Sequence, residues 1–102
     1  MAIIRGTTPT VTFTFSDVDI TDIAVAFLVI KQNDRKMIEK DISTATAGQH
    51  SLAWTLSQTE TLMLSRGTDA KIFCDWRTVN GTRGRSVLKV EKVEDTGKNE
   101  VI

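Results

Sequence analysis

The sequence contains little that would support a disulfide, a membrane span or a secretion signal. It has one cysteine, Cys74, which cannot form a disulfide within the chain. The longest apolar run, residues 23–30, is far shorter than the roughly 20 residues that a membrane-spanning helix needs. Residues 1–5 lack a basic start followed by a long apolar stretch, and Pro9 interrupts what comes next. We therefore expect a protein made and folded in a reducing cytosol, with no membrane partner.

Residues suited to catalysis or metal binding are also scarce. His50 is the single histidine, and a catalytic triad built on it would need its other members from elsewhere in the fold. One cysteine and one histidine leave only scattered carboxylates for a metal site. Cys74 alternates with Ile72 and Trp76, which is typical of a small buried side chain. The sequence therefore predicts a protein that is not an enzyme, with no catalytic, cofactor-binding or metal-binding residues.

Neither sign of charge is in excess. The 102 residues include 13 Lys+Arg and 13 Asp+Glu, so the formal net charge is zero. This balance gives no bulk attraction to nucleic acid or anionic lipid, and it suits a subunit that assembles with copies of itself. Arg77, Arg83 and Arg85 nevertheless form a candidate basic patch around the Asn80-Gly81 turn. It is either a phosphate or RNA contact or a solvated hairpin tip, and the few aromatic residues nearby weigh against nucleic acid.

What the sequence does contain is hydrophobic alternation at period two. Residues 10–15 place threonine and apolar residues on opposite faces of one strand. Asn33-Asp34 and Asn80-Gly81 indicate hairpin turns, and Ser57-Gln58-Thr59-Glu60 matches the capping box that begins a helix. The predicted strands cover residues 10–15, 23–31, 36–42, 50–56, 70–78 and 86–93, and the predicted helix covers residues 58–64.

These elements predict an all-β fold. We expect an antiparallel immunoglobulin-like β-sandwich of roughly six to eight short strands with one short helix. Hydrophobic residues make up 40% of the chain, which is enough for one core. The predicted domain covers residues 1–93 and begins with an extended N-terminal arm, residues 1–8. Residues 94–102 form a polar C-terminal tail.

The run at residues 23–30 is apolar on both faces, unlike a strand with one solvated face. Two explanations are open: the second face is covered inside the domain, or it contacts another subunit. We hypothesise that Val25, Phe27 and Val29 help to form such an interface. The arm adds Arg5, Thr7 and Thr8 as candidate interface residues, because it could reach a neighbouring subunit.

Four stretches carry a family resemblance across nearly the whole chain: Ile3-Ile4-Arg5-Gly6-Thr7-Thr8-Pro9-Thr10, Lys31-Gln32-Asn33, Leu56-Ser57-Gln58-Thr59-Glu60-Thr61-Leu62 and Asn80-Gly81-Thr82. In this order the chain resembles small virion structural proteins of tailed phages and prophages of Gram-positive bacteria. It is more loosely similar to the N-terminal domain of phage upper baseplate proteins. Asp34 stands where that pattern has a hairpin glycine.

The resemblance implies a structural role. We expect a non-enzymatic subunit of a tailed phage particle, made in the host cytoplasm and placed in the virion at the tail or baseplate. Its partners would be other phage structural proteins and copies of itself. A capsid decoration or head-fibre protein is the alternative within this class, and a small nucleic-acid-binding domain is the alternative from another class. No cofactor is expected.

Overall fold

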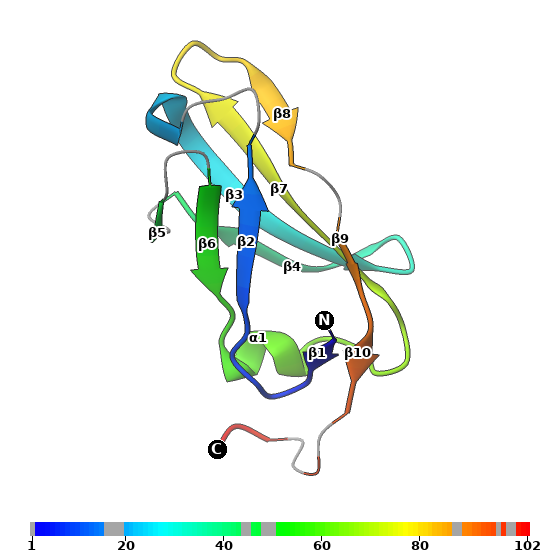
Figure 1. Cartoon of the computed structure of the whole chain (residues 1–102). Helices are drawn as coiled ribbons and strands as arrows, with labels where there is room; N and C mark the ends of the chain where they lie inside the picture. Colours follow the sequence, from blue (N-terminus) through cyan, green and yellow to red (C-terminus); the bar gives the residue numbers. More distant parts are fainter. Residues whose placement is uncertain are drawn as a thin grey trace.

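The computed structural model describes residues 2–15, 20–43, 46–47, 51–86, 89–95, 97 and 100–102 (Figure 1). Most of this part of the chain is β-strand. The strands are β1 (Ile3–Ile4), β2 (Thr10–Thr14), β3 (Ile23–Gln32), β4 (Arg35–Asp41), β5 (Thr46–Ala47), β6 (Ser51–Thr55), β7 (Ala70–Thr78), β8 (Arg83–Arg85), β9 (Lys89–Glu91) and β10 (Val93–Glu94), and the helices are the 3-10 turn η1 (Ile20–Asp22) and α1 (Gln58–Leu62).

The described strands form two larger sheets and one short pair. One sheet has the order β2-β6-β5, and the other has the order β4-β3-β7-β8 with β9 also paired to β7. All pairs in these two sheets are antiparallel, whereas β1 and β10 pair in parallel. The prediction of a mostly β protein with antiparallel strands and one short α-helix is therefore confirmed.

The two larger sheets share one hydrophobic core. From the smaller sheet Val11, Phe13 and Leu52 face inward, and from the larger sheet Leu28 and Ile72 do so. The alternation predicted for residues 10–15 is confirmed, because the threonines of β2 are exposed and its apolar residues are buried. In Figure 1, β2 and β6 lie across one face of the sheet that contains β3, β4 and β7. That leaves the opposite face of the larger sheet open to the outside.

The longest strand, β3, is paired with a strand on each side and ends at a tight turn. It pairs with β4 on one side and β7 on the other. At its end Asn33 and Asp34 adopt positive φ angles of 50° and 62°, the conformation that a two-residue hairpin loop requires. The predicted hairpin is thus confirmed.

The chain after the Asn80-Gly81 turn departs from the prediction. A single strand over residues 86–93 is wrong. β8 ends before this segment, residues 87–88 lie outside the described residues, β9 pairs with β7, and residue 93 already belongs to β10, which pairs with β1. Ser86 ends β8: its hydroxyl accepts from the Cys74 N–H at 2.8 Å, and its own N–H donates to the Cys74 carbonyl at 2.9 Å. The Cys74 N–H would bond a backbone carbonyl if the strand continued. Here it bonds the Ser86 hydroxyl instead.

Helix α1 begins at the predicted capping box. The Ser57 hydroxyl accepts from the Glu60 N–H at 3.1 Å, and the Glu60 carboxylate accepts from the Ser57 N–H at 2.9 Å. Both of these N–H groups would otherwise lack a partner at the start of the helix. The helix ends at Leu62, two residues earlier than predicted.

Three of the four stretches that carry the family resemblance meet around this helix, whereas Asn80-Gly81-Thr82 lies at the β7–β8 turn. The buried Thr61 hydroxyl donates to the Thr7 carbonyl and accepts from the Gly6 N–H, both at 2.9 Å. The Gln32 side chain is buried and bonds the backbone of Ser65 and Thr68 just beyond the helix. These residues hold loops together, so they are structural.

The N-terminal arm, expected to be extended, is docked on its own domain. Ile3 is fully buried and pairs with Val93 in the short parallel sheet. Arg5 donates to the Leu62 carbonyl at 3.1 Å and forms an ion pair with Asp95 at 3.0 Å. The predicted tail also begins inside the fold, since β10 includes Glu94.

Candidate interaction surface on the large sheet

The face of the larger sheet that points away from the core is called the outer face here. Residues directly opposite one another on neighbouring strands share a face, so the register identifies its members. They are Val25, Phe27, Val29 and Lys31 on β3, Lys71, Phe73, Asp75 and Arg77 on β7, Arg83 and Arg85 on β8, Val90 on β9, and Lys36, Glu39 and Asp41 on β4.

The register brings together two sets of residues that the sequence had kept apart. Val25 is opposite Arg77, which is opposite Arg83. One row further along, Phe27 is opposite Asp75, which is opposite Arg85. The candidate interface residues of β3 and the candidate basic patch therefore form one surface. Sequence reasoning missed this because the contacts join strands about 50 residues apart in the chain.

The three apolar side chains of β3 on this face differ in exposure. Phe27 is 36% exposed and Val25 is half-buried, so both present apolar surface to solvent. Val29 is only 4% exposed. Its side chain is covered within the domain, so the expectation that Val29 lies open at an interface is corrected. It has Glu39 on one side and Phe73 on the other.

Phe73 is covered by charged side chains. The Arg85 guanidinium carbon lies 4.1 Å from the centre of the ring, and Lys31 Nζ lies 6.0 Å from it. Arg85 also donates to the Asp75 carboxylate at 3.0 Å. Long basic side chains can bury an aromatic ring under their methylene groups while their charge stays in water. Arg85 is therefore already engaged inside the domain.

Arg77 and Arg83 are arranged differently. Both are exposed, they face one another across β7 and β8, and in the described part of the chain neither forms an ion pair. They line a depression of about 270 Å³ whose other walls come from Val25, Phe27, Asp75 and Trp76. The depression combines apolar walls with two guanidinium groups.

The outer face is positively charged although the chain is neutral. Among its described members, the cations Lys31, Lys36, Lys71, Arg77, Arg83 and Arg85 outnumber the carboxylates Glu39, Asp41 and Asp75. The acidic groups have local partners. Glu39 pairs with Lys36 at 3.0 Å, and hydrogen bonds from the Ser43 hydroxyl and N–H hold the pKa of Asp41 below its usual value.

The inner face of β7 holds Cys74 and Trp76. Cys74 is fully buried, and this burial raises the pKa of its thiol to about 12, which makes it a poor nucleophile at neutral pH. Trp76 meets Phe15 edge to face, with ring centres 6.1 Å apart. The Trp76 ring occupies the space that a side chain on Gly84 would need. The sequence signal for this contact is a glycine inside a strand.

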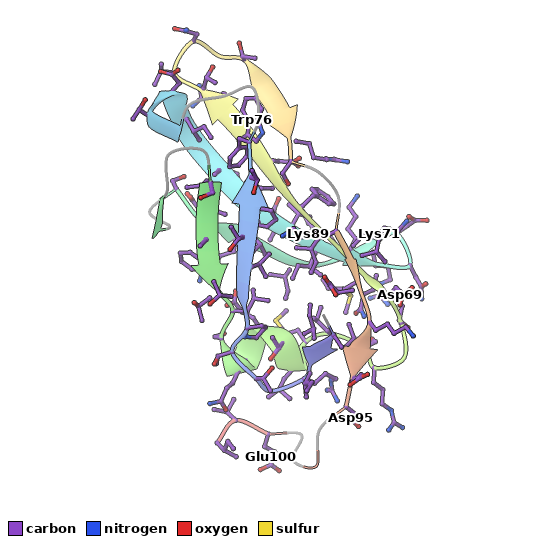
Figure 2. The ribbon with its side chains drawn as sticks, viewed as in Figure 1. Asp69, Lys71, Trp76, Lys89, Asp95 and Glu100 are labelled. Atoms are coloured by element: carbon purple, nitrogen blue, oxygen red, sulfur yellow. The ribbon has the colours of Figure 1, made fainter. Side chains whose placement is uncertain are left out.

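The arm residues lie at the other end of the molecule. Figure 2 shows Trp76 near β8 at one end and Asp95, the partner of Arg5, at the other. Thr7 and Thr8 are exposed there, whereas Arg5 is half-buried. The structure thus does not join Arg5, Thr7 and Thr8 to the outer face, and their role at an interface stays a prediction.

His50 lies outside the described residues. Within the described ranges, no three His, Cys, Asp or Glu residues are grouped so that they could hold a metal ion. Over the same ranges, no helix has the length and apolar character needed to cross a membrane.

Comparisons with protein-family models, with curated proteins and with solved structures give no match for this chain.

Proposed function

We propose that this chain is a non-enzymatic structural subunit of a tailed phage particle, which assembles through the outer face of its larger sheet. The observation that carries the assembly role is Phe27, a large aromatic residue exposed at the centre of a sheet face and bordered by charge. Central aromatic anchors with a polar rim are typical of protein interfaces. The phage context comes from the sequence resemblance.

The proposal includes a fold and a location. Two antiparallel sheets around one core, with short connections, support an immunoglobulin-like β-sandwich. The location is the virion, at the tail or baseplate, with other phage structural proteins and further copies of this chain as partners. A capsid decoration or head-fibre protein is the alternative placement.

The test uses particles of the phage that encodes the chain. Wild type, Phe27→Glu and Thr12→Glu would each be supplied to particles lacking the native copy, and the bound fraction measured by sedimentation. Thr12 is exposed on the other sheet and serves as the control. We expect Phe27→Glu to lose binding while its circular dichroism and melting temperature stay close to wild type. Undiminished binding of a folded Phe27→Glu would refute the assembly role.

A second candidate function, nucleic-acid binding, is favoured by the excess of cations on the outer face. The arrangement around Phe27 opposes it, because Asp41 and Asp75 lie directly opposite this residue on the two neighbouring strands. A base stacked on Phe27 would bring its phosphates toward two carboxylates. A labelled oligonucleotide that shifts with wild type at low salt, but not with Arg77→Ala/Arg83→Ala, would support this second function.

A further inference from the structure

The depression between Val25, Phe27, Arg77 and Arg83 has a chemistry that specifies its occupant. We infer that it binds a carboxylate that lies next to an apolar side chain on a partner protein. This inference rests on the proposed function and names the chemical class of the group that docks. The argument has a charged part, an apolar part and an exclusion of other occupants.

The charged part is the cross-strand pair Arg77 and Arg83. Like charges directly opposite one another on a sheet repel. A carboxylate placed between these two side chains would accept charge-assisted hydrogen bonds from both guanidinium groups, which favour planar, two-point contacts. The nearest described carboxylate on this face, Asp75, is already paired with Arg85 at 3.0 Å. The anion therefore has to come from outside.

The apolar part is the wall formed by Val25 and Phe27. Phe27 is 36% exposed, and the depression encloses about 270 Å³, which is room for an aliphatic side chain. Filling it would remove apolar surface from water on both partners. The apolar wall and the guanidinium groups are adjacent, since Val25 is directly opposite Arg77. An acidic residue and an apolar residue next to it on the partner can therefore contact the guanidinium groups and the apolar wall together.

Charge decides against two other occupants. The same face of a second copy would bring two surfaces together that each carry more cations than carboxylates, so they would repel. A nucleic acid would meet Asp41 and Asp75 beside Phe27. In an acidic protein segment, the apolar side chain and not the charge would lie on Phe27, while the carboxylate would lie between Arg77 and Arg83, one row away from Asp75 in the register.

The experiment titrates the isotopically labelled protein with N-acetyl-L-leucinate and follows backbone amide shifts by NMR at low ionic strength. N-acetyl-L-leucinamide lacks the charge and sodium acetate lacks the apolar group, so these two are the matched probes. We expect saturable shifts at Phe27, Asp75, Arg77 and Arg83, with binding about fivefold weaker or more for either matched probe.

Two variants locate the site. Arg77→Gln/Arg83→Gln should reduce the affinity for N-acetyl-L-leucinate to that for N-acetyl-L-leucinamide. Arg35→Gln, an exposed arginine near the β3–β4 turn, should leave the titration unchanged. Shifts that are equally large with acetate, or that appear equally at Arg35, would show ordinary ion pairing and overturn the inference.

The outcomes also separate this inference from the proposed function. A blank titration together with loss of particle binding by Phe27→Glu overturns the carboxylate chemistry and leaves the assembly role standing. A positive titration together with undiminished particle binding by Phe27→Glu supports the subsite and overturns the assembly role.

Discussion

The two faces of β3 are both apolar in sequence, yet their side chains differ in exposure to solvent. On the inner face Ala26, Leu28 and Ile30 are all completely buried. On the outer face, exposure changes from residue to residue: Val29 is buried, whereas Phe27 is 36% exposed. The inner face is covered by a second sheet, which buries these three residues. In the described part of the chain, the side chains that lie over Phe73 on the outer face, those of Arg85 and Lys31, come from its own sheet.

The length of the neighbouring side chains explains the pattern on the outer face. Val29 is next to Phe73, over which the long side chains of Arg85 and Lys31 extend. Phe27 lies between Asp41 and Asp75, whose single methylene groups are too short to cover a ring. Long basic side chains thus cover Phe73, whereas the two short aspartates leave Phe27 exposed.

The largest expected effect contrasts Leu28→Ala with Phe27→Ala. Deleting the fully buried Leu28 side chain should lower the free energy of unfolding by about 2–5 kcal/mol. Phe27→Ala, on the open face, should lower it by about 1 kcal/mol or less. Urea denaturation with unchanged m-values would measure both. Equal losses would mean that Phe27 belongs to the core, and the covered-face explanation for β3 would then hold.

Gly84→Ala tests how tightly the inner face is filled. A Cβ at this position would clash with Trp76 Cζ2, so the indole would have to shift, which would disturb its edge-to-face contact with Phe15. We expect a loss of about 1–3 kcal/mol in thermal or urea unfolding. Gly97→Ala is the control, since no atom lies within 4 Å of the added Cβ. A neutral Gly84→Ala would show that the Trp76 end of the core is loosely packed.

Cys74 gives the inner face a pH dependence in the alkaline range. Its thiol pKa is about 12 in the folded chain against 9.0 for an ordinary thiol, so between these values the unfolded chain releases a proton that the folded chain keeps. This contribution to stability is complete below pH 9.0 and declines as the pH rises toward about 12. The decline should be up to about 1.4 kcal/mol per pH unit.

The measurement is the difference in free energy of unfolding between wild type and Cys74→Ala across that range, because the two proteins differ only in the thiol. The difference should shrink with pH. A constant difference would mean that the thiol ionises as easily inside the fold as outside it, which would contradict its burial.

Local patterns in the sequence predicted much of this fold. The alternation in β2, the capping box at Ser57 and the Asn33-Asp34 turn depend on neighbouring residues, and each is as expected. Contacts between distant residues could not be predicted. The docking of the arm on Thr61 is one example, and the end of β8 at Ser86 is another.

The candidate surface was predicted in pieces for the same reason. Phe27 and Arg77 could each be singled out from their own strands. Their placement on one face depends on the register between β3 and β7, and Phe73, the neighbour of Val29 on β7, is covered by Arg85 from β8. Hydrophobic pattern identifies an apolar face, but the length of the side chains across the sheet determines whether that face stays open.

Arg85→Ala and Arg83→Ala form the subtlest test of this view. Arg85 stacks on Phe73 and pairs with Asp75, so its removal should lower the free energy of unfolding by about 1 kcal/mol. Arg83, two residues earlier on the same strand and exposed, should change it by about 0.5 kcal/mol or less. Arg85→Lys should restore part of the loss, because its methylene chain can still lie over the ring. If the two alanine variants were equally stable, Phe73 would not depend on Arg85 for cover, and the openness of Phe27 would need a cause other than short neighbours.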